Sequence, residues 1–380
     1  MEFVATKEDG IVTRYVDQKR WQWLGAFALP VIPMSAFVFY FMSGANALYL
    51  CLPLVFFFIL VPLLDALVGG DANNPPEEVV PAMSGDSHYE NVVYLIMPVY
   101  FALFFMTVWM VGTQNLPIWA VIALALGIGS INGNMITIAH ELGHKIDRKN
   151  QLLSRVALSL SGYGHFVLEH NHGHHINVAT PEDCASARFN ESVYAFALRE
   201  LPGAFVGGWR IAAKRMRAKG LPVFHWLNEI LQVYLATTLI TIGLVAWLGW
   251  AVLPFILAHH FISCYSLTEV NYIEHYGLLR NKRPNGKYEP CEARHSWNTN
   301  HTVSNLLSFH LQRHSDHHAH PMRPYQALRD YQDVPTLSSG YPGTILLAMF
   351  PPLWFKVMNP KVMAWAGGDI DKVNTGPAKD

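Results

Sequence analysis

Three short clusters of histidines stand out in the sequence, which contains 19 histidines in all. The clusters read HELGH at 140–144, EHNHGHH at 169–175 and HSDHH at 314–318, and a further histidine lies in NYIEHYG at 271–277. Neutral imidazole is a common metal ligand, and histidines three or four residues apart lie on one face of a helix. Three such clusters in one chain predict a metal centre.

The number of candidate ligands predicts more than one metal ion. We expect His140 and His144 to share a helical face. In the second cluster we expect His170 and His174 to share a face, with His175 displaced by one position. A zinc site uses three or four protein ligands, so nine histidines suit two ions with open positions. Imidazole binds iron, copper and zinc alike, which leaves the metal open. The nine candidate ligands are His140, His144, His170, His174, His175, His275, His314, His317 and His318.

Two carboxylates near the clusters are candidates for orienting a ligand imidazole. Metal-bound histidines usually donate their second ring N–H to a carboxylate, a carbonyl or water. Glu141 lies inside the first cluster, and Asp183 follows the second. The alternatives are a solvated helix face for Glu141 and a helix or turn cap for Asp183. No catalytic residue beyond the metal ligands is predicted.

The elements that must position these histidines are predicted to be membrane helices. Hydrophobic residues make up 51% of the chain and charged residues 14%, and the mean hydropathy is +0.18. A helix needs about 20 apolar residues to cross a bilayer, so an all-α integral membrane protein is predicted. Six buried helices of a soluble protein are the alternative, but such helices usually carry polar stripes. The six apolar blocks are 21–42, 46–68, 92–111, 118–138, 226–248 and 250–270.

The positions of the basic residues predict the orientation of the spans. All 27 Lys and Arg residues lie in 1–20, 145–219 and 280–379. Because basic loops stay on the cytoplasmic side, six spans place both termini and all three clusters there. A helix from Ile118 to His144 would be about 40 Å long, whereas the hydrocarbon core is about 30 Å thick. The first cluster is therefore expected just beyond the inner membrane surface, in a cytoplasmic helical cap.

One membrane-embedded catalytic domain is predicted over residues 21–366. Its cytoplasmic histidine regions are 140–225 and 271–342. Residues 1–20 are predicted to form a cytoplasmic N-terminal segment without the cleavage site of a removable signal peptide, and 367–380 a frayed C-terminal tail. The net charge of −1 gives no indication of a nucleic-acid partner, and none is expected.

Several residues inside the spans are assigned structural roles. His259 and His260 lie within the sixth apolar block, where polar groups are costly, and we interpret them as participants in an interhelical hydrogen bond. Gly127, Gly129 and Gly133 in the fourth block permit close helix packing.

The histidine clusters resemble a known family. HELGHK, EHNHGHH and LQRHSDHHAHP resemble the three histidine boxes of membrane-bound fatty-acid desaturases and hydroxylases. The segments NYIEHYGL, PEDCASARFNES and WNTNHTVSNLLSFHLQRHSDHH are similar to those of bacterial alkane 1-monooxygenases. The similarity extends from about the first span to residues 341–343, which is most of the chain.

This resemblance implies a non-haem di-iron enzyme that hydroxylates the terminal methyl of medium- or long-chain alkanes to 1-alkanols with O₂. It implies that the nine histidines ligate two irons, and that His172 and His320 do not. The alkane would arrive from the bilayer, and electrons from a rubredoxin and its reductase at the cytoplasmic face of the bacterial inner membrane. Basic residues near the metal are candidates for rubredoxin docking, with lipid anchoring as the alternative: Arg210, Lys214, Arg215, Arg217, Lys219, Arg280, Lys282 and Arg283.

Other functions fit some of the same residues. A fatty-acyl desaturase or an aryl-methyl hydroxylase of the same superfamily would use the same ligands, and the product, alkene or alcohol, distinguishes them. An intramembrane zinc protease would use HELGH, with Glu141 as general base, but would leave seven histidines unused. Transport sites typically lie near the bilayer midplane, whereas these clusters are predicted beyond it.

Overall fold

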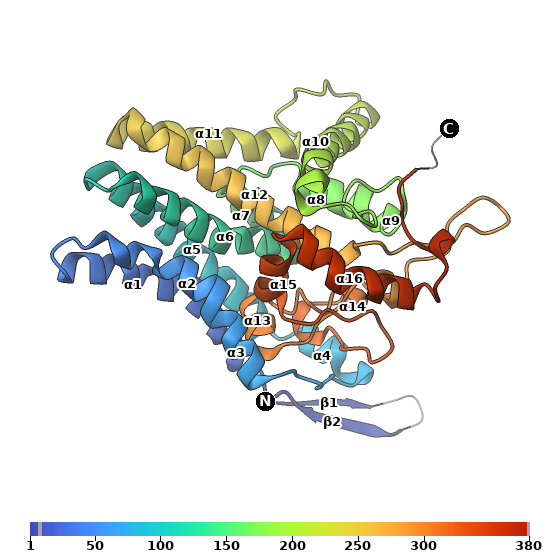
Figure 1. Ribbon diagram of the computed structural model, residues 1–380. Helices are drawn as coiled ribbons and strands as arrows, with labels where there is room; N and C mark the ends of the chain where they lie inside the picture. Colours follow the sequence, from blue (N-terminus) through green and yellow to red (C-terminus); the bar gives the residue numbers. More distant parts are fainter. Residues whose placement is uncertain (7–9, 378–380) are drawn as a thin grey trace.

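The computed structural model describes residues 1–6 and 10–377, and it is built mainly of helices (Figure 1). Among the described residues, six helical segments are long and apolar enough to cross a membrane, which confirms the six predicted spans. The third, fourth and sixth extend beyond the predicted ends because a helix continues past its apolar block into polar sequence. The segments are Gln22–Met42 (with α1, Ala28–Met42), Ala47–Val68 (with α2, Leu52–Val55, and α3, Val61–Val68), Ser87–Thr113 (α5), Ile118–Gly143 (α6), Glu229–Leu248 (α11) and Trp250–His275 (with α12, Leu253–His275).

Helix α6 is the centre of the spanning bundle. Within its most apolar 18-residue window, 83% of the residues are buried, compared with 17% for the peripheral α11. Helices α6 and α12 pack closely against each other because small residues line the contact. A Cβ added to Gly129 would lie 2.8 Å from Ile262, and one added to Gly133 would lie 3.0 Å from Ser266. This agrees with the packing role expected for these glycines.

Hydrogen bonds between spans accompany this packing. The Asn132 side chain on α6 lies 2.9 Å from Nε2 of the buried His259 on α12. The Asn134 amide donates to the Tyr100 hydroxyl at 2.8 Å and to the Leu307 carbonyl at 3.1 Å. The interhelical hydrogen bond expected for His259 is therefore confirmed.

The remaining elements gather at one end of the bundle, where α6 and α12 also end (Figure 1). They form a cap of helices and loops, joined by an N-terminal hairpin of strands β1 (Glu2–Thr6) and β2 (Val12–Val16), which the sequence did not predict. The cap helices are α4 (Val80–Ser84), α7 (Arg148–Ser159), α8 (Phe166–Glu169), α9 (His175–Asn177), α10 (Val193–Ala218), α13 (Thr302–Leu307), α14 (His314–Ala319), α15 (Tyr341–Ala348) and α16 (Pro351–Trp365).

The C-terminal segment is docked on the cap as far as it is described. Val373 and Asn374 are 2% and 1% exposed. The carbonyl of Asn374 accepts a hydrogen bond of 2.7 Å from the Phe189 amide, and Val373 forms a β-bridge with Leu278. Val373 and Asn374 are therefore packed on the cap, unlike the frayed tail expected from residue 367 onward, because they pair their backbone with the cap and Val373 buries an apolar side chain.

Candidate metal centre

The end of α6 carries the first two candidate ligands. His140 lies in the last turn of the helix, and His144 follows directly after its end. Their Nε2 atoms are 3.2 Å apart, because residues four apart lie one above the other on a helix. The shared face expected for this pair is therefore confirmed.

The second cluster departs from α-helical geometry. A π-helical turn occupies His170–His174 between α8 and α9, and the backbone N–H of His175 donates to the carbonyl of His170. This i to i+5 spacing brings Nε2 of His175 to 2.9 Å from Nε2 of His170. The rings of His170 and His174, which were expected to share a face, are 5.3 Å apart between centroids, but the two residues belong to different ligand groups, because one π turn moves each later residue round the helix. His174 instead points toward His318, with Nε2 atoms 3.3 Å apart.

The third cluster lies on α14 and contributes to both sides of the centre. His314 and His318 are four residues apart, and their Nε2 atoms approach to 2.8 Å. His317 projects the other way, 2.9 Å from Nε2 of His140 and 3.1 Å from that of His175. At the end of α12, Nε2 of His275 is buried and has no hydrogen-bond partner.

All nine candidate histidines are thereby brought together in two adjacent groups. Within each group, one nitrogen of every imidazole lies within 4.8 Å of the others. The groups touch, with the rings of His175 and His318 4.5 Å apart between centroids. One group contains His140, His144, His170, His175 and His317, and the other His174, His275, His314 and His318. His172 and His320 lie outside both groups.

The spacing of the nitrogens fits metal ligation. Two imidazole nitrogens bound at about 2.1 Å and at right angles around one ion would be about 3.0 Å apart. The closest Nε2 pairs here are 2.8 to 3.3 Å apart. Neutral imidazole nitrogens turned toward one another at this distance, together with the unpartnered Nε2 of His275, are typical of a donor set for a cation.

Burial keeps the imidazoles neutral, as metal binding requires. Burial lowers the pKa of His144 to about 4. Burial and the surrounding imidazoles also hold the pKa well below its ordinary value at His170, His175, His314, His317 and His318. A desolvated imidazolium among other imidazoles is unfavourable, so the nitrogen lone pairs stay available at neutral pH.

Asp183 orients one of these imidazoles. Its Oδ2 lies 2.9 Å from Nδ1 of His174 and accepts a hydrogen bond of 2.6 Å from the Ser186 hydroxyl. Burial disfavours charge on His174, but the Asp183 carboxylate outweighs this effect and raises the pKa of the imidazole. In the neutral tautomer the proton stays on Nδ1, facing Asp183, and Nε2 keeps its lone pair for a metal.

Glu141 does not have the contact suggested by its position in the first cluster. No hydrogen bond connects its carboxylate to any of the nine imidazoles in the part of the chain that the structure describes. The hydrogen bonds of the described residues therefore give no support to an orienting role for Glu141.

Replacing Asp183 by asparagine is expected to weaken metal binding by about 10-fold to 100-fold. The amide keeps the shape of the carboxylate but loses the charge that holds the His174 proton on Nδ1. Metal content after dialysis against a graded series of chelator concentrations measures the effect. Glu141→Gln is the matched control, since Glu141 contacts no imidazole, and an equal loss of metal in both variants would contradict the assignment.

A second carboxylate, Glu274, lies against the four-histidine group and was not predicted from the sequence. Its Oε2 is 3.1 Å from Nε2 of His314, and its Oε1 accepts a hydrogen bond from the Tyr341 hydroxyl. On the far side of His275, Nδ1 lies 3.3 Å from the Ser296 hydroxyl. The one feature of the sequence that could have pointed to Glu274 is that it directly precedes the candidate ligand His275.

The two groups differ in their access to the surface. All four members of the second group are buried, whereas His144 and His175 in the first are partly exposed. These two form the floor of an open surface pocket that also includes Arg215. Its rim carries two exposed apolar side chains, Ile146 at 90% and Met322 at 63%.

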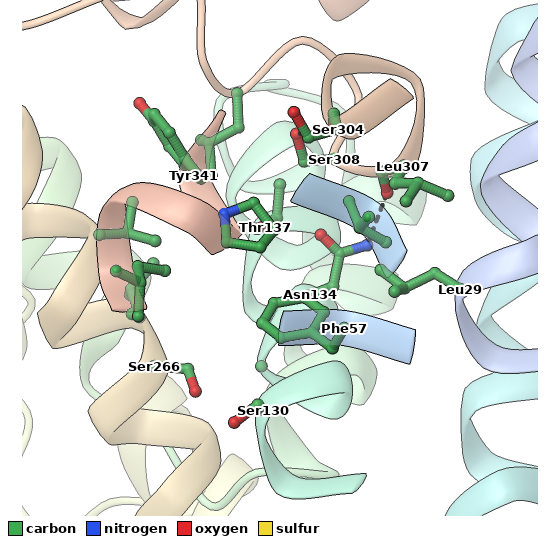
Figure 2. A pocket seen from close by; sticks show the side chains of 17 residues that line it. Leu29, Phe57, Ser130, Asn134, Thr137, Ser266, Ser304, Leu307, Ser308 and Tyr341 are labelled. Atoms are coloured by element: carbon green, nitrogen blue, oxygen red, sulfur yellow. Dashed lines mark hydrogen bonds between the residues drawn. The ribbon is translucent and has the colours of Figure 1, made fainter. Parts of the chain in front are cut away.

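An internal cavity lies next to the centre on its spanning side, and Figure 2 shows the side chains that line it. It has a volume of about 70 Å³ and is lined mainly by α6, α12, α13 and α15. Thr137, one helical turn before His140, and Tyr341, which bonds Glu274, connect it to the histidine groups. Polar side chains such as Ser130 and Thr137 are part of the lining, but most of the exposed lining surface is apolar, which suits a hydrocarbon chain.

Comparisons with known proteins agree with this arrangement. The fatty acid desaturase family model matches residues 115–342. Alkane 1-monooxygenase 1 of Alcanivorax borkumensis is 44% identical over 363 residues, covering 96% of this chain and 90% of the relative. Alkane 1-monooxygenase of Ectopseudomonas oleovorans is 45% identical over 359 residues (94% and 89%), and that of Acinetobacter baylyi is 37% identical over 369 residues (96% and 90%). The chain folds as a six-span helical bundle that ends in nine clustered histidines, and it is similar to these relatives along nearly its whole length. It therefore belongs to the alkane 1-monooxygenases of the fatty acid desaturase family.

Proposed function

We propose that the protein hydroxylates the terminal methyl of a medium- or long-chain alkane to a 1-alkanol, using O₂ and electrons from a rubredoxin. The observation that carries this proposal is the pairing of two all-imidazole groups with an apolar cavity that ends beside them. Iron is the proposed metal in both groups, where it supplies the chemistry that activates O₂.

The protein supplies ligands, orientation and exclusion of water. An alkane has no polar handle, so only the shape of the cavity can present its end to the centre. Apolar side chains such as Leu267, Val270 and Leu307 provide most of the exposed surface of the cavity, which disfavours water beside the reacting carbon. Asp183 holds the proton of His174 at Nδ1, and the Tyr341 hydroxyl donates to Glu274 beside His314.

Other functions receive less support. In a zinc protease of the HExxH type, Glu141 would serve as general base beside a single metal, and such a site would leave seven of the nine clustered histidines unused. A desaturase or an aryl-methyl hydroxylase would use the same ligands. Relatives named alkane 1-monooxygenase that match nearly the whole chain favour the alkane reaction.

The test is product analysis with a metal assay. Protein purified from membranes is expected to contain two irons per chain. With rubredoxin, its reductase and isotopically labelled O₂, a mixture of n-alkanes should yield labelled 1-alkanols and no alkene. One stoichiometric zinc without iron, or an alkene as the main product, would overturn the proposal.

We further propose that the histidine end of the bundle faces the cytoplasm of a bacterial inner membrane. Support comes from the 27 Lys and Arg residues, which avoid the spans and the opposite loops. Reporter fusions in the loop at 114–117 should read as external, and at Lys149 as internal.

Electrons are proposed to enter through the surface pocket over His144 and His175. Exposed apolar side chains next to a basic group are typical of a protein-docking surface, and here Ile146 and Met322 flank Arg215. Arg280, one of the predicted docking residues, is unsuitable: it is 7% exposed, and its guanidinium donates to the carbonyls of Ile176, Val178 and Glu289. It was misassigned because its burial in the cap depends on contacts remote in sequence.

Arg215→Glu is expected to raise the apparent KM for rubredoxin about 5-fold to 10-fold and to weaken its salt dependence, because one cation facing an acidic partner becomes an anion. Steady-state kinetics at several salt concentrations measure this. Arg14→Glu, the same change on the exposed N-terminal hairpin, is the control and should have no effect. Equal loss of turnover with a small-molecule reductant would show that Arg215 supports the site itself.

A further inference from the structure

Two polar atoms on α12 are buried without a hydrogen-bond partner. These are the hydroxyl of Tyr265 and Oε1 of Glu269, and the Glu269 residue is only 2% exposed. The residues are four apart, so their side chains lie on one face of the helix. A buried polar atom without a partner is destabilising, and such groups are rare enough to require an explanation. Two of them on one helical face indicate a ligand that forms hydrogen bonds.

Both residues line an apolar groove on the side of the bundle. The groove has a volume of about 480 Å³ and runs between the second span, α6, α12 and α15, where Phe58, Leu126 and Met349 line it. Leu126 is 41% exposed on the surface that contacts lipid. Glu269 lies six residues before His275, or about 9 Å along the helix, so the polar end of the groove is near the histidine face. This arrangement suits an amphiphile with an alkyl chain and a small polar head.

The groove and the internal cavity are neighbours that share two lining residues. Ser130 on α6 and Ser266 on α12 line both spaces. Figure 2 shows these two serines on either side of the same end of the cavity, away from Tyr341, Ser304 and Ser308. A chain leaving the cavity toward the lipid would pass between Ser130 and Ser266 into the groove.

We infer that the groove binds the 1-alkanol product as it leaves the cavity, with the alkanol hydroxyl hydrogen-bonded to Tyr265 and Glu269. A hydroxyl can donate to the Glu269 carboxylate and accept from the Tyr265 hydroxyl at once, while its alkyl chain lies along the apolar wall. An alkane offers neither bond, so the groove distinguishes product from substrate. This inference rests on the proposed function for the identity of the alcohol.

A hydroxylated lipid headgroup offers the same chemistry, and the experiment must separate the two sources. The metal-loaded protein is placed in phosphatidylcholine nanodiscs, whose headgroups carry no free hydroxyl, and titrated with 1-decanol, decane or the methyl ether of decanol. Tyr265→Phe and Glu269→Leu are each expected to raise the Kd for 1-decanol about 10-fold, equivalent to about 1.4 kcal/mol for one lost hydrogen bond. The Kd for decane should be unchanged.

The matched control is Tyr49→Phe, the same substitution at a residue 37% exposed in the second span, and it should bind 1-decanol as the wild type does. An unchanged Kd for 1-decanol in both groove variants would overturn the inference. An equal rise in the Kd for decane would overturn it too, because it would indicate that the two residues have an apolar or structural role. Phosphatidylglycerol nanodiscs, whose headgroups carry free hydroxyls, provide the lipid comparison. If phosphatidylglycerol displaced 1-decanol from the wild type but not from the variants, Tyr265 and Glu269 would be assigned to a lipid headgroup, and the inference would be overturned. The titration measures binding and needs no turnover. A protein that did not hydroxylate alkanes would therefore be detected by product analysis, independently of the result for 1-decanol binding.

Discussion

His275→Ala is expected to abolish alkane hydroxylation, a loss of at least about 100-fold, and to lower the metal content by one ion per chain. Loss of a direct ligand should cost at least as much as loss of a residue that orients one, which typically costs 10-fold to 100-fold. The four-histidine group has no spare imidazole: without His275 only three remain. Its Nε2 has no hydrogen-bond partner, so the substitution removes no hydrogen bond from that nitrogen.

The same substitution in the other group gives a graded comparison. His144→Ala leaves four imidazoles around the first ion, so this variant should retain more metal than His275→Ala, although its activity should also be lost. His320→Ala is the control, because His320 is half exposed and lies outside both groups. Metal analysis and turnover measured on the same preparation provide the test. Full metal content in His275→Ala, or a comparable loss in His320→Ala, would contradict the two-group assignment.

The sequence predicted which histidines come together but not how they divide. The spans and the clusters are local patterns, and apolar blocks and short spacings are sufficient to find them. The division depends on one π-helical turn at His170–His174, which pairs His170 with His175. The α-helical spacing assumed for the sequence put His170 and His174 on one face, with His175 one position round. A π turn adds one residue to a helix, and the second histidine box contains no proline or other strong signal that announces it.

Contacts between segments that are distant in the sequence could not be predicted from sequence patterns either. Tyr341 and Glu274 are 67 residues apart in the chain, and neither has a spacing that indicates the other. Arg280 had the appearance of a surface cation, yet its guanidinium binds carbonyls on either side of it in sequence. The contact of Asp183 with His174, by contrast, could be expected from the sequence, because metal-bound histidines commonly require a carboxylate nearby.

Thr137→Phe is expected to lower kcat/KM for n-alkanes about 100-fold without changing the metal content. Thr137 is buried, lines the internal cavity and precedes His140 by one helical turn (Figure 2). A phenyl ring at this position would occupy the end of the cavity where the terminal methyl must lie. Misplacement of a reacting group by about 1 Å can cost about 100-fold in rate, and the ring would displace the substrate at least that far.

Thr137→Val distinguishes the steric effect of the side chain from the effect of losing its hydroxyl. Valine has nearly the same shape but no hydroxyl, so hydroxylation should be largely retained if the residue acts only as part of the cavity wall. Overpacking a core typically costs about 1–3 kcal/mol, and thermal unfolding of both variants shows whether Thr137→Phe is still folded at the assay temperature. Equal loss of activity in the two variants would assign a role to the hydroxyl. Unchanged turnover in a folded Thr137→Phe protein would mean that the alkane reaches the histidine groups by a path other than this cavity.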